Sequence, residues 1–314
     1  MAIGEGTASA NQATHRHVRE GRKVGFFTDP TVCIGCKACE VACKEWNRVP
    51  DDGFAWSGNS YDNTGALGAS SWRHVMFVEQ ERPGGGSVAG LSVEGERVDD
   101  RTAAAAEPEP GEPLVTVDPE DGEAFRWLFV SDVCKHCEQA GCLEACPTGA
   151  IVRGENGAVL VQDDVCNGCG YCVTGCPFGV IDRRPEPLEG AGGAFKCTFC
   201  YDRQAHGHTP ACAKACPTES IQFGPLDELK EQAAVRVEEL RERGFEDARL
   251  YDPVDTSVEG LHAFFLLLGE PETFGYPPAP EVPTVHLRAG WTSALLTSAA
   301  ALAAVLLVFA RAAP

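Results

Sequence analysis

Sixteen cysteines are the residues of this 314-residue sequence whose type and spacing best suit chemistry. They form four quartets, each of which opens with C-x-x-C and closes with C-x-x-x-C. The quartets are Cys33, Cys36, Cys39 and Cys43; Cys134, Cys137, Cys142 and Cys146; Cys166, Cys169, Cys172 and Cys176; and Cys197, Cys200, Cys212 and Cys216. Thiolates are metal ligands, and several of them on one short loop can reach the same centre. The quartets therefore predict metal centres.

The spacing within the quartets favours iron–sulfur clusters. The run C-x2-C-x2-C-x3-C-P is typical of bacterial ferredoxins with two clusters, in which the fourth cysteine ligates the neighbouring cluster. Quartet three fits this run in full. Lys44 replaces the proline after quartet one, and the second gap is longer in quartets two and four. The sequence therefore predicts four [4Fe–4S] clusters on its sixteen cysteines.

Zinc sites and disulfides are the alternatives for these cysteines. Structural zinc sites usually combine two C-x2-C hooks across a long spacer, and three cysteines within seven residues are hard to place tetrahedrally around one ion. A disulfide framework belongs to small secreted domains, for which this protein is too long. His136 lies inside quartet two, and we interpret it as a spacer or hydrogen-bond donor because the cysteines already complete the ligand count.

No other chemistry competes with the cysteines. We find no phosphate-binding loop, no G-x-G-x-x-G that opens a helix and no credible Ser/His/Asp set in the sequence. A net charge of −20 and a pI near 4.8 argue against a nucleic-acid partner, because phosphate binding requires a basic face. The sequence thus predicts a protein that conducts electrons and has no catalytic site of its own.

The lysines are concentrated near the quartets. Five of the seven lie inside or beside one, namely Lys37, Lys44, Lys135, Lys196 and Lys214. One interpretation is chance placement on exposed loops. The other is that these cations favour the reduced, more negative state of a nearby cluster and so raise its reduction potential.

Short strands and helices must position the cysteine loops. Runs with β propensity precede three quartets, at Val24–Thr28, Trp127–Val130 and Val159–Gln162. In each unit we expect a strand, the cysteine loop, a short helix that ends at the Cys-Pro pair, and a second short strand. Proline ends the helix because it lacks the N–H donor and clashes with the preceding turn.

The rest of the protein is predicted to contain a tail, an insertion and an extension. Residues 1–24 carry no secretory signal and read as a flexible tail. Residues 49–125 read as an insertion, with a partly disordered acidic segment from Gly84 to about Glu123. Residues 226–283 form a C-terminal extension of helix and strand, with a helix at 226–243 and then a proline-rich linker.

Residues 289–310 are predicted to form a transmembrane helix. These 22 residues carry no charge and are bounded by Arg288 and Arg311, and about 20 apolar residues span a bilayer as a helix. A buried core helix is the alternative, although such helices are usually shorter and more amphipathic. The lipid bilayer is therefore an expected partner.

Motifs around the quartets carry a family resemblance. They are VCIGCKACEVACKEWN (32–47), YDN (61–63), GCLEACP (141–147), CNGCGYCVTGCPF (166–178), FKCTFCYDR (195–203), PACAKACPT (210–218) and RGFEDARLYDP (243–253). Together they resemble the iron–sulfur (beta) subunits of molybdopterin oxidoreductases of the dimethyl-sulfoxide-reductase family. The resemblance is greatest to the beta subunit of membrane-bound, formate dehydrogenase-N-type enzymes. The acidic segment departs from this pattern.

The resemblance implies an α+β fold with two ferredoxin-like two-cluster domains in nested repeats, plus one C-terminal transmembrane helix. Residues 25–48 and 195–225 would form the first domain, and residues 126–194 the second. The implied ligand sets are Cys33, Cys36, Cys39 and Cys216 for cluster A; Cys43, Cys197, Cys200 and Cys212 for cluster B; Cys134, Cys137, Cys142 and Cys176 for cluster C; and Cys146, Cys166, Cys169 and Cys172 for cluster D. Some relatives lack a cysteine of quartet three and hold a three-iron cluster, but all four are present here.

The resemblance also implies a function. A catalytic alpha subunit with a molybdenum or tungsten pterin would oxidise formate, and this protein would carry the electrons to a membrane cytochrome b gamma subunit and then to quinone. It would be a single-pass protein of the cell (inner) membrane, with its globular part on the periplasmic or extracytoplasmic side. The alternatives are the equivalent subunit of a membrane hydrogenase or another molybdoenzyme and, from a different class, a zinc-stabilised membrane scaffold.

Overall fold

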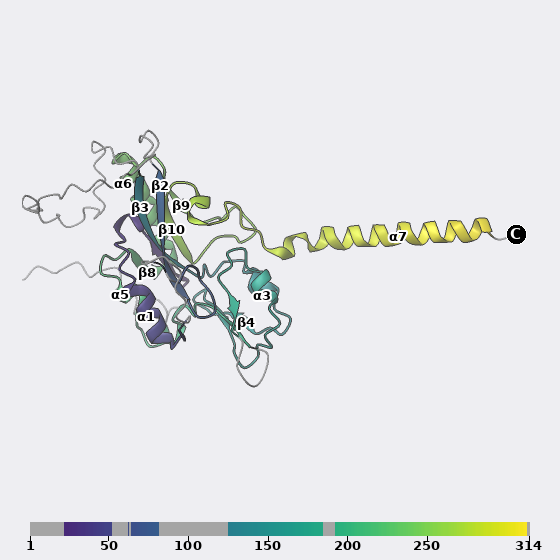
Figure 1. Ribbon diagram of the computed structural model, residues 1–314, viewed down its shortest axis with the longest axis horizontal. Helices are drawn as coiled ribbons and strands as arrows, with labels where there is room; N and C mark the ends of the chain where they lie inside the picture. The colour runs from purple at the N-terminus through teal and green to yellow at the C-terminus, as the bar shows by residue number, and fades with distance from the viewer. Residues whose placement is uncertain (1–21, 52–61, 63, 82–124, 185–191, 313–314) are drawn as a thin grey trace, which may run out of the picture.

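The computed structural model describes residues 22–51, 62, 64–81, 125–184 and 192–312. The predicted acidic segment, and all but the last residues of the predicted tail, lie outside these ranges. The described residues form a body of short strands and helices from which one long helix projects (Figure 1).

A four-stranded sheet joins strands from distant parts of the sequence. Its order is β8-β1-β10-β9, made of β8 (Ile221–Pro225), β1 (Val24–Thr28), β10 (Ala263–Leu268) and β9 (Ala248–Tyr251). β1 is antiparallel to β8 and parallel to β10, which is antiparallel to β9. Every residue of β1 and β10 is buried, as expected for apolar strands covered on both faces. Because β1 leads into quartet one and β8 follows quartet four, the sheet places these two quartets side by side.

Helix α6 (Leu226–Glu242) packs against three strands of this sheet, β1, β8 and β9. Its buried residues recur every three or four positions and are Leu229, Ala233, Val237 and Leu240. Gly244 follows the helix with a φ of +93°, the left-handed conformation of a helix C-terminus, which glycine adopts without strain. The helix predicted at 226–243 is therefore confirmed. A short 3-10 helix, η4 (Pro271–Phe274), follows β10.

Strand β3 (Phe125–Val133) leads into quartet two and is longer than the predicted run at Trp127–Val130. It pairs antiparallel with β2 (Arg73–Glu81), and Arg73 lies opposite Val133. β2 belongs to the predicted insertion, for which the sequence predicts no strand. The insertion therefore contributes an ordered β-hairpin partner to the body.

Short elements follow the expected order in quartets two, three and four, whereas after quartet one α1 (Ala38–Asn47) continues past Cys43 and no strand follows in residues 48–51. Quartet one lies between η3 (Pro30–Val32) and the end of α1 (Ala38–Asn47). Quartet two includes α2 (Gly141–Glu144) and precedes β4 (Ile151–Arg153), while quartet three lies between β5 (Val159–Val161) and β6 (Asp182–Arg183) and includes α3 (Tyr171–Thr174). Quartet four follows β7 (Ala194–Phe195) and contains α4 (Tyr201–Ala205) and α5 (Ala211–Ala215) before β8. β4 pairs with β5, and β6 with β7.

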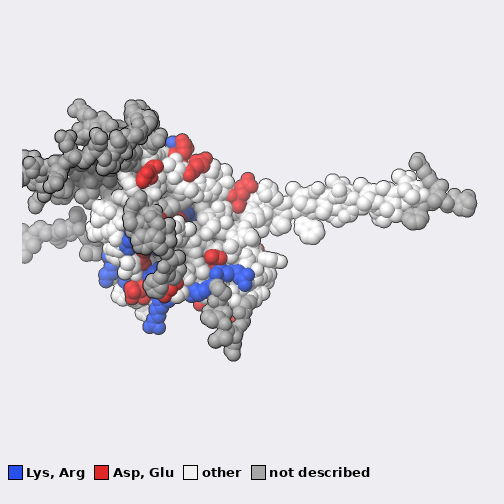
Figure 2. Space-filling model, viewed as in Figure 1, with Lys and Arg blue, Asp and Glu red and all other residues white. Residues whose placement is uncertain are grey.

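Helix α7 (Leu287–Ala312) projects from the body (Figure 1). The stretch Pro283–Val308 is long and apolar enough to cross a membrane, and none of it is buried. On the face shown in Figure 2, the described part of this helix carries no Lys, Arg, Asp or Glu surface, unlike the body. A fully exposed helix contradicts the alternative of a buried core helix. At its foot, η5 (Pro283–His286) packs against α2, and Thr284 Oγ1 donates a hydrogen bond to the Glu144 carboxylate.

Candidate iron–sulfur cluster sites

Four cysteines line one cavity beside α2. They are Cys134, Cys137, Cys142 and Cys176. The end of β3 delivers Cys134, α2 carries Cys142, and Cys176 follows α3. The cavity therefore combines the first three cysteines of quartet two with the last cysteine of quartet three.

Two facing glycines let α2 and α3 approach closely enough to form this cavity. A Cβ atom on Gly141 would lie 2.3 Å from the carbonyl oxygen of Gly175, and a Cβ on Gly175 would lie 3.0 Å from the carbonyl oxygen of Gly141. The first distance is shorter than real Cβ contacts allow, so only glycine fits at position 141. This close approach is what brings Cys176 to the cysteines of quartet two.

A second cavity is lined by residues that include Cys33, Cys36, Cys39 and Cys216. Asp29 fixes the turn before Cys33, because its carboxylate accepts hydrogen bonds from the backbone N–H and hydroxyl of Thr31 at 2.8 and 2.6 Å. Cys216 follows α5 and comes from a distant part of the sequence. Three cysteines of quartet one and the last cysteine of quartet four thus share one cavity.

Electrostatic neighbours group the remaining cysteines. Burial raises the pKa of the Cys43 thiol well above its usual value, and neighbouring thiols raise it further. Those neighbours are Cys197, Cys212 and Cys200. Burial and then nearby thiols raise the pKa of Cys172 to about 11. Its neighbours are Cys166, Cys169 and Cys146. Cys43 and Cys172 therefore each lie near the other three members of their implied ligand sets.

The four sets suit a multi-metal cluster. Burial raises the pKa of the Cys39 and Cys142 thiols to about 12, so these sulfurs ionise only when a cationic metal centre binds them. Within the described ranges, no three Cys, His, Asp or Glu side chains converge tightly enough to hold a single metal ion. Thiolates spread around a cavity instead fit a cluster whose iron atoms occupy different corners.

All four C-x-x-C turns share one backbone conformation. The residue before the second cysteine has a positive φ in every quartet: +65° at Gly35, +45° at His136, +68° at Gly168 and +59° at Phe199. A left-handed residue in such a turn points successive N–H groups to one side, which makes a concave site for an anion. Phe199 is an outlier for this region, and strain of roughly 1–3 kcal/mol persists only where the surroundings enforce it. The repeat is therefore conformational as well as sequential.

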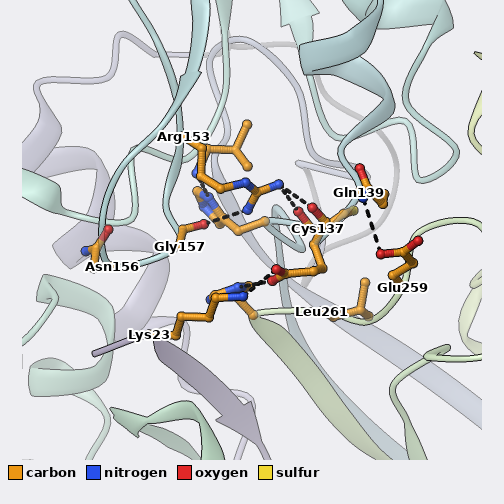
Figure 3. A network of polar contacts seen from close by, with 12 residues as sticks. Lys23, Cys137, Gln139, Arg153, Asn156, Gly157, Glu259 and Leu261 are labelled. Carbon is orange, nitrogen blue, oxygen red and sulfur yellow. Dashed lines mark hydrogen bonds and ion pairs between the residues drawn. The ribbon is translucent and has the colours of Figure 1, made fainter. Parts of the chain in front are cut away.

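The loop of quartet two is held by long-range contacts that the sequence does not predict. The Arg153 guanidinium, at the end of β4, donates to the carbonyl oxygens of Cys137 at 2.7 Å and Gly157 at 3.2 Å (Figure 3). Gln139 N–H donates to the Val258 carbonyl at 2.8 Å, and its side chain donates to Glu259 at 3.2 Å. The predicted C-terminal extension therefore fixes a cysteine loop directly, and no local motif marks these long-range contacts.

A carboxylate beside the same loop is held ionised. Burial would raise the pKa of Glu138, but hydrogen bonds from Lys23 and His262 lower it to about 2. His262 precedes β10 and also contacts the Val24 carbonyl oxygen at 2.8 Å. His262 therefore links the four-stranded sheet to the loop of quartet two.

His136 is buried beside the cavity of quartet two. Its Nδ1 accepts a hydrogen bond from the Val159 N–H at 3.0 Å, so Nε2 carries the proton in the neutral ring. Nε2 is buried and has no hydrogen-bond partner among the described residues. The side chain is thus fixed by Val159 and leaves one unused N–H donor.

The structure separates the five lysines near the quartets. Lys214 is exposed and Lys44 is half-buried, while Lys37 pairs with Asp62 and Glu40 at 3.3 and 3.4 Å. Lys135 is buried but forms an ion pair with Asp132. Lys196 is also buried, and its ammonium donates to the carbonyl oxygens of Val159 and Cys197. Of the five, Lys196 is the buried lysine without a carboxylate partner in the described part of the protein.

The fold and the cysteine sets define an iron–sulfur protein of the dicluster class. Two family models of the 4Fe–4S dicluster domain match this sequence, over residues 32–150 and 125–226. A formate dehydrogenase iron–sulfur subunit of Haemophilus influenzae is 36% identical over 264 residues, which are 83% of this protein and 70% of the relative. The iron–sulfur subunit of the nitrate-inducible formate dehydrogenase of Escherichia coli is 37% identical over 284 residues, which are 89% of this protein and 80% of the relative. A thiosulfate reductase electron transfer subunit of Salmonella typhi is 36% identical over 213 residues, which are 68% of this protein and 81% of the relative.

The protein therefore belongs to the family of formate dehydrogenase iron–sulfur subunits. It has two dicluster domains with four [4Fe–4S] clusters and serves as the electron-transfer subunit of a larger oxidoreductase complex that includes a catalytic subunit. The predicted fold class, clusters and electron-transfer function are confirmed by these findings.

Proposed function

We propose that this protein passes electrons from formate, oxidised by a molybdopterin (Mo or W) alpha subunit, to a membrane cytochrome b gamma subunit and quinone. The single observation that carries the proposal is that four sets of cysteines lie in a body from which an apolar helix projects. When bound, a [4Fe–4S] cluster supplies one-electron transfer at a potential that its surroundings set.

We assign each cluster to the cysteines that lie together. Cluster A takes Cys33, Cys36, Cys39 and Cys216; cluster B takes Cys43, Cys197, Cys200 and Cys212; cluster C takes Cys134, Cys137, Cys142 and Cys176; and cluster D takes Cys146, Cys166, Cys169 and Cys172. The shared cavities support sets A and C, and the effects of neighbouring thiols on pKa support sets B and D. With these pairs, residues 25–48 with 195–225 and residues 126–194 form the two ferredoxin-like domains.

The ligand sets follow one another in the order A, B, C, D. Cys212 of set B is an electrostatic neighbour of Cys39 in set A. Cys134 of set C likewise neighbours Cys197 of set B. Cys172 of set D neighbours Cys142 of set C. The protein therefore offers one continuous path through its body.

The two ends of this path reach the surface. Cys36 in set A and Cys169 in set D are exposed, whereas all four cysteines of set B are buried. The foot of the projecting helix packs against α2, which carries Cys142 of set C. We therefore place set D toward the membrane and set A toward the catalytic partner. By the family resemblance, the globular body lies on the periplasmic or extracytoplasmic side.

The donor is tested on the complex purified anaerobically from its native membrane. Formate is expected to bleach the visible absorption of the clusters and to reduce the cytochrome b, whereas hydrogen is expected to leave both unchanged. Bleaching by hydrogen and not by formate would identify a hydrogenase partner instead. Bleaching by neither would point to a different molybdoenzyme and overturn the formate assignment.

A further inference from the structure

Arg73 is a buried cation that lies outside the cysteine motifs. It lies at the start of β2, and 2% of the residue is exposed. Its Nη1 donates to the carbonyl oxygen and the hydroxyl of Ser131 at 3.1 and 3.2 Å, and its guanidinium lies 5.0 Å from the ring centre of Phe26. Nε and Nη2 have no hydrogen-bond partner among the described residues.

A buried guanidinium without a carboxylate is costly, because taking a charge out of water is unfavourable unless another charge compensates it. Arginine cannot escape this cost by losing its proton. Ser131, which accepts from Arg73, also lines the cavity of set A. The ring of Phe26 packs at 5.0 Å against the ring of Phe199, which stands between Cys197 and Cys200 of set B. Burial would lower the pKa of Arg73, but the charges of four cysteine sulfurs, which are thiolates when they ligate metal, raise it above its usual value. These are Cys212, Cys39, Cys197 and Cys43.

A direct series of contacts joins Arg73 to one of these sulfurs. Ser131 Oγ lies 3.2 Å from Cys39 Sγ and 3.2 Å from Arg73 Nη1. Cys39 belongs to set A, whereas Cys43, Cys197 and Cys212 belong to set B. The guanidinium therefore lies at the junction of sets A and B.

We propose that Arg73 is a shared counter-cation for clusters A and B, and that it raises the reduction potential of both. A cluster with its thiolates is an anion and becomes more negative on reduction, so a fixed cation nearby favours the reduced state. Arg73 acts through charge and through the Ser131 contact, and is a positioning residue rather than a ligand. This inference rests on the proposed ligand sets.

Lys196 provides a matched comparison at the next junction. It is buried in the lining of the cavity that holds Cys134 and Cys142, and its ammonium donates to the carbonyl oxygen of Cys197 at 3.2 Å. The first two belong to set C and the third to set B. Set B is therefore the set that both Arg73 and Lys196 approach through the contacts described above.

The test is an EPR-monitored redox titration of the purified complex carrying Arg73→Met or Lys196→Met. Each midpoint is assigned with one Cys→Ser variant per cluster. Arg73→Met is expected to raise the oxidised-to-reduced ratio of clusters A and B roughly tenfold at a given potential. This corresponds to midpoint potentials about 59 mV lower for a one-electron couple. The midpoint potentials of clusters C and D should stay unchanged. Lys196→Met is expected to lower the midpoint potentials of clusters B and C and to leave those of clusters A and D unchanged.

Arg73→Lys keeps the charge and should retain most of the parent midpoints, which separates charge from packing. If Arg73→Met does not assemble clusters A and B, the neutral Arg73→Gln replaces it in the same titration. Unchanged midpoints in A and B, or equal shifts in all four clusters, would overturn the inference and leave the proposed function intact. A parent complex without four titrating clusters would instead overturn the ligand sets on which it rests.

Discussion

Cys176→Ser is expected to remove cluster C, even though Cys176 belongs to quartet three, and to stop electron flow to quinone almost completely. Cys176 lines the same cavity as Cys134, Cys137 and Cys142. Cluster C lies between B and D in the proposed order, so its loss interrupts the path rather than shortening it. Iron should fall from about sixteen to about twelve atoms per protein molecule, and one EPR component should disappear.

Cys146→Ser is the matched control for this variant. Cys146 closes quartet two but lies near Cys166, Cys169 and Cys172, so its replacement should remove cluster D and leave cluster C. Each variant should therefore remove the cluster that is held mainly by the other quartet. If Cys176→Ser removed cluster D and Cys146→Ser removed cluster C, each quartet would bind its own cluster and the nested assignment would be wrong.

Truncation of the protein before Arg288 is expected to release the body from the membrane with its clusters intact. No cysteine lies beyond Cys216, and residues 288–308, which the truncation removes, are exposed. The truncated complex should lose quinone-linked turnover and keep electron transfer to soluble dyes. Membrane fractionation, iron content and dye-linked turnover measure these three effects.

The control for truncation replaces residues 289–310 with an unrelated uncharged, leucine-rich run of the same length. This variant should return to the membrane fraction, because length and hydrophobicity are what insertion requires. Quinone-linked turnover in this variant then reports whether the helix only anchors or also contacts the membrane partner. A truncated protein that still fractionated with membranes when expressed without partners would contradict the anchor.

Local signals in the sequence predicted the parts of the fold that local rules control. Proline and cysteine spacing located the short helices and strands of the cysteine units, and the three- and four-residue steps from Leu229 to Leu240 located α6. The uncharged run at 289–310 located the projecting helix. Each of these signals depends on neighbours within a few residues.

Long-range pairing was beyond the same reasoning. The run Ala263–Leu268 is continuously apolar, and such a run has no period that separates a strand from a buried helix. The sequence did not predict β2 because its partner strand, β3, follows the acidic segment and is distant in the sequence. Arg73 was missed with it, since nothing in its neighbourhood indicates that folding places it beside Cys39 and Cys43.

The most direct test of the account is a metal and spin count on the anaerobically purified protein. Four [4Fe–4S] clusters predict about sixteen iron atoms per protein molecule, with acid-labile sulfide in equal amount and four reducible S = 1/2 centres after dithionite. Zinc without iron, in protein kept from oxygen throughout, would contradict the electron-transfer function and return the cysteines to a structural role.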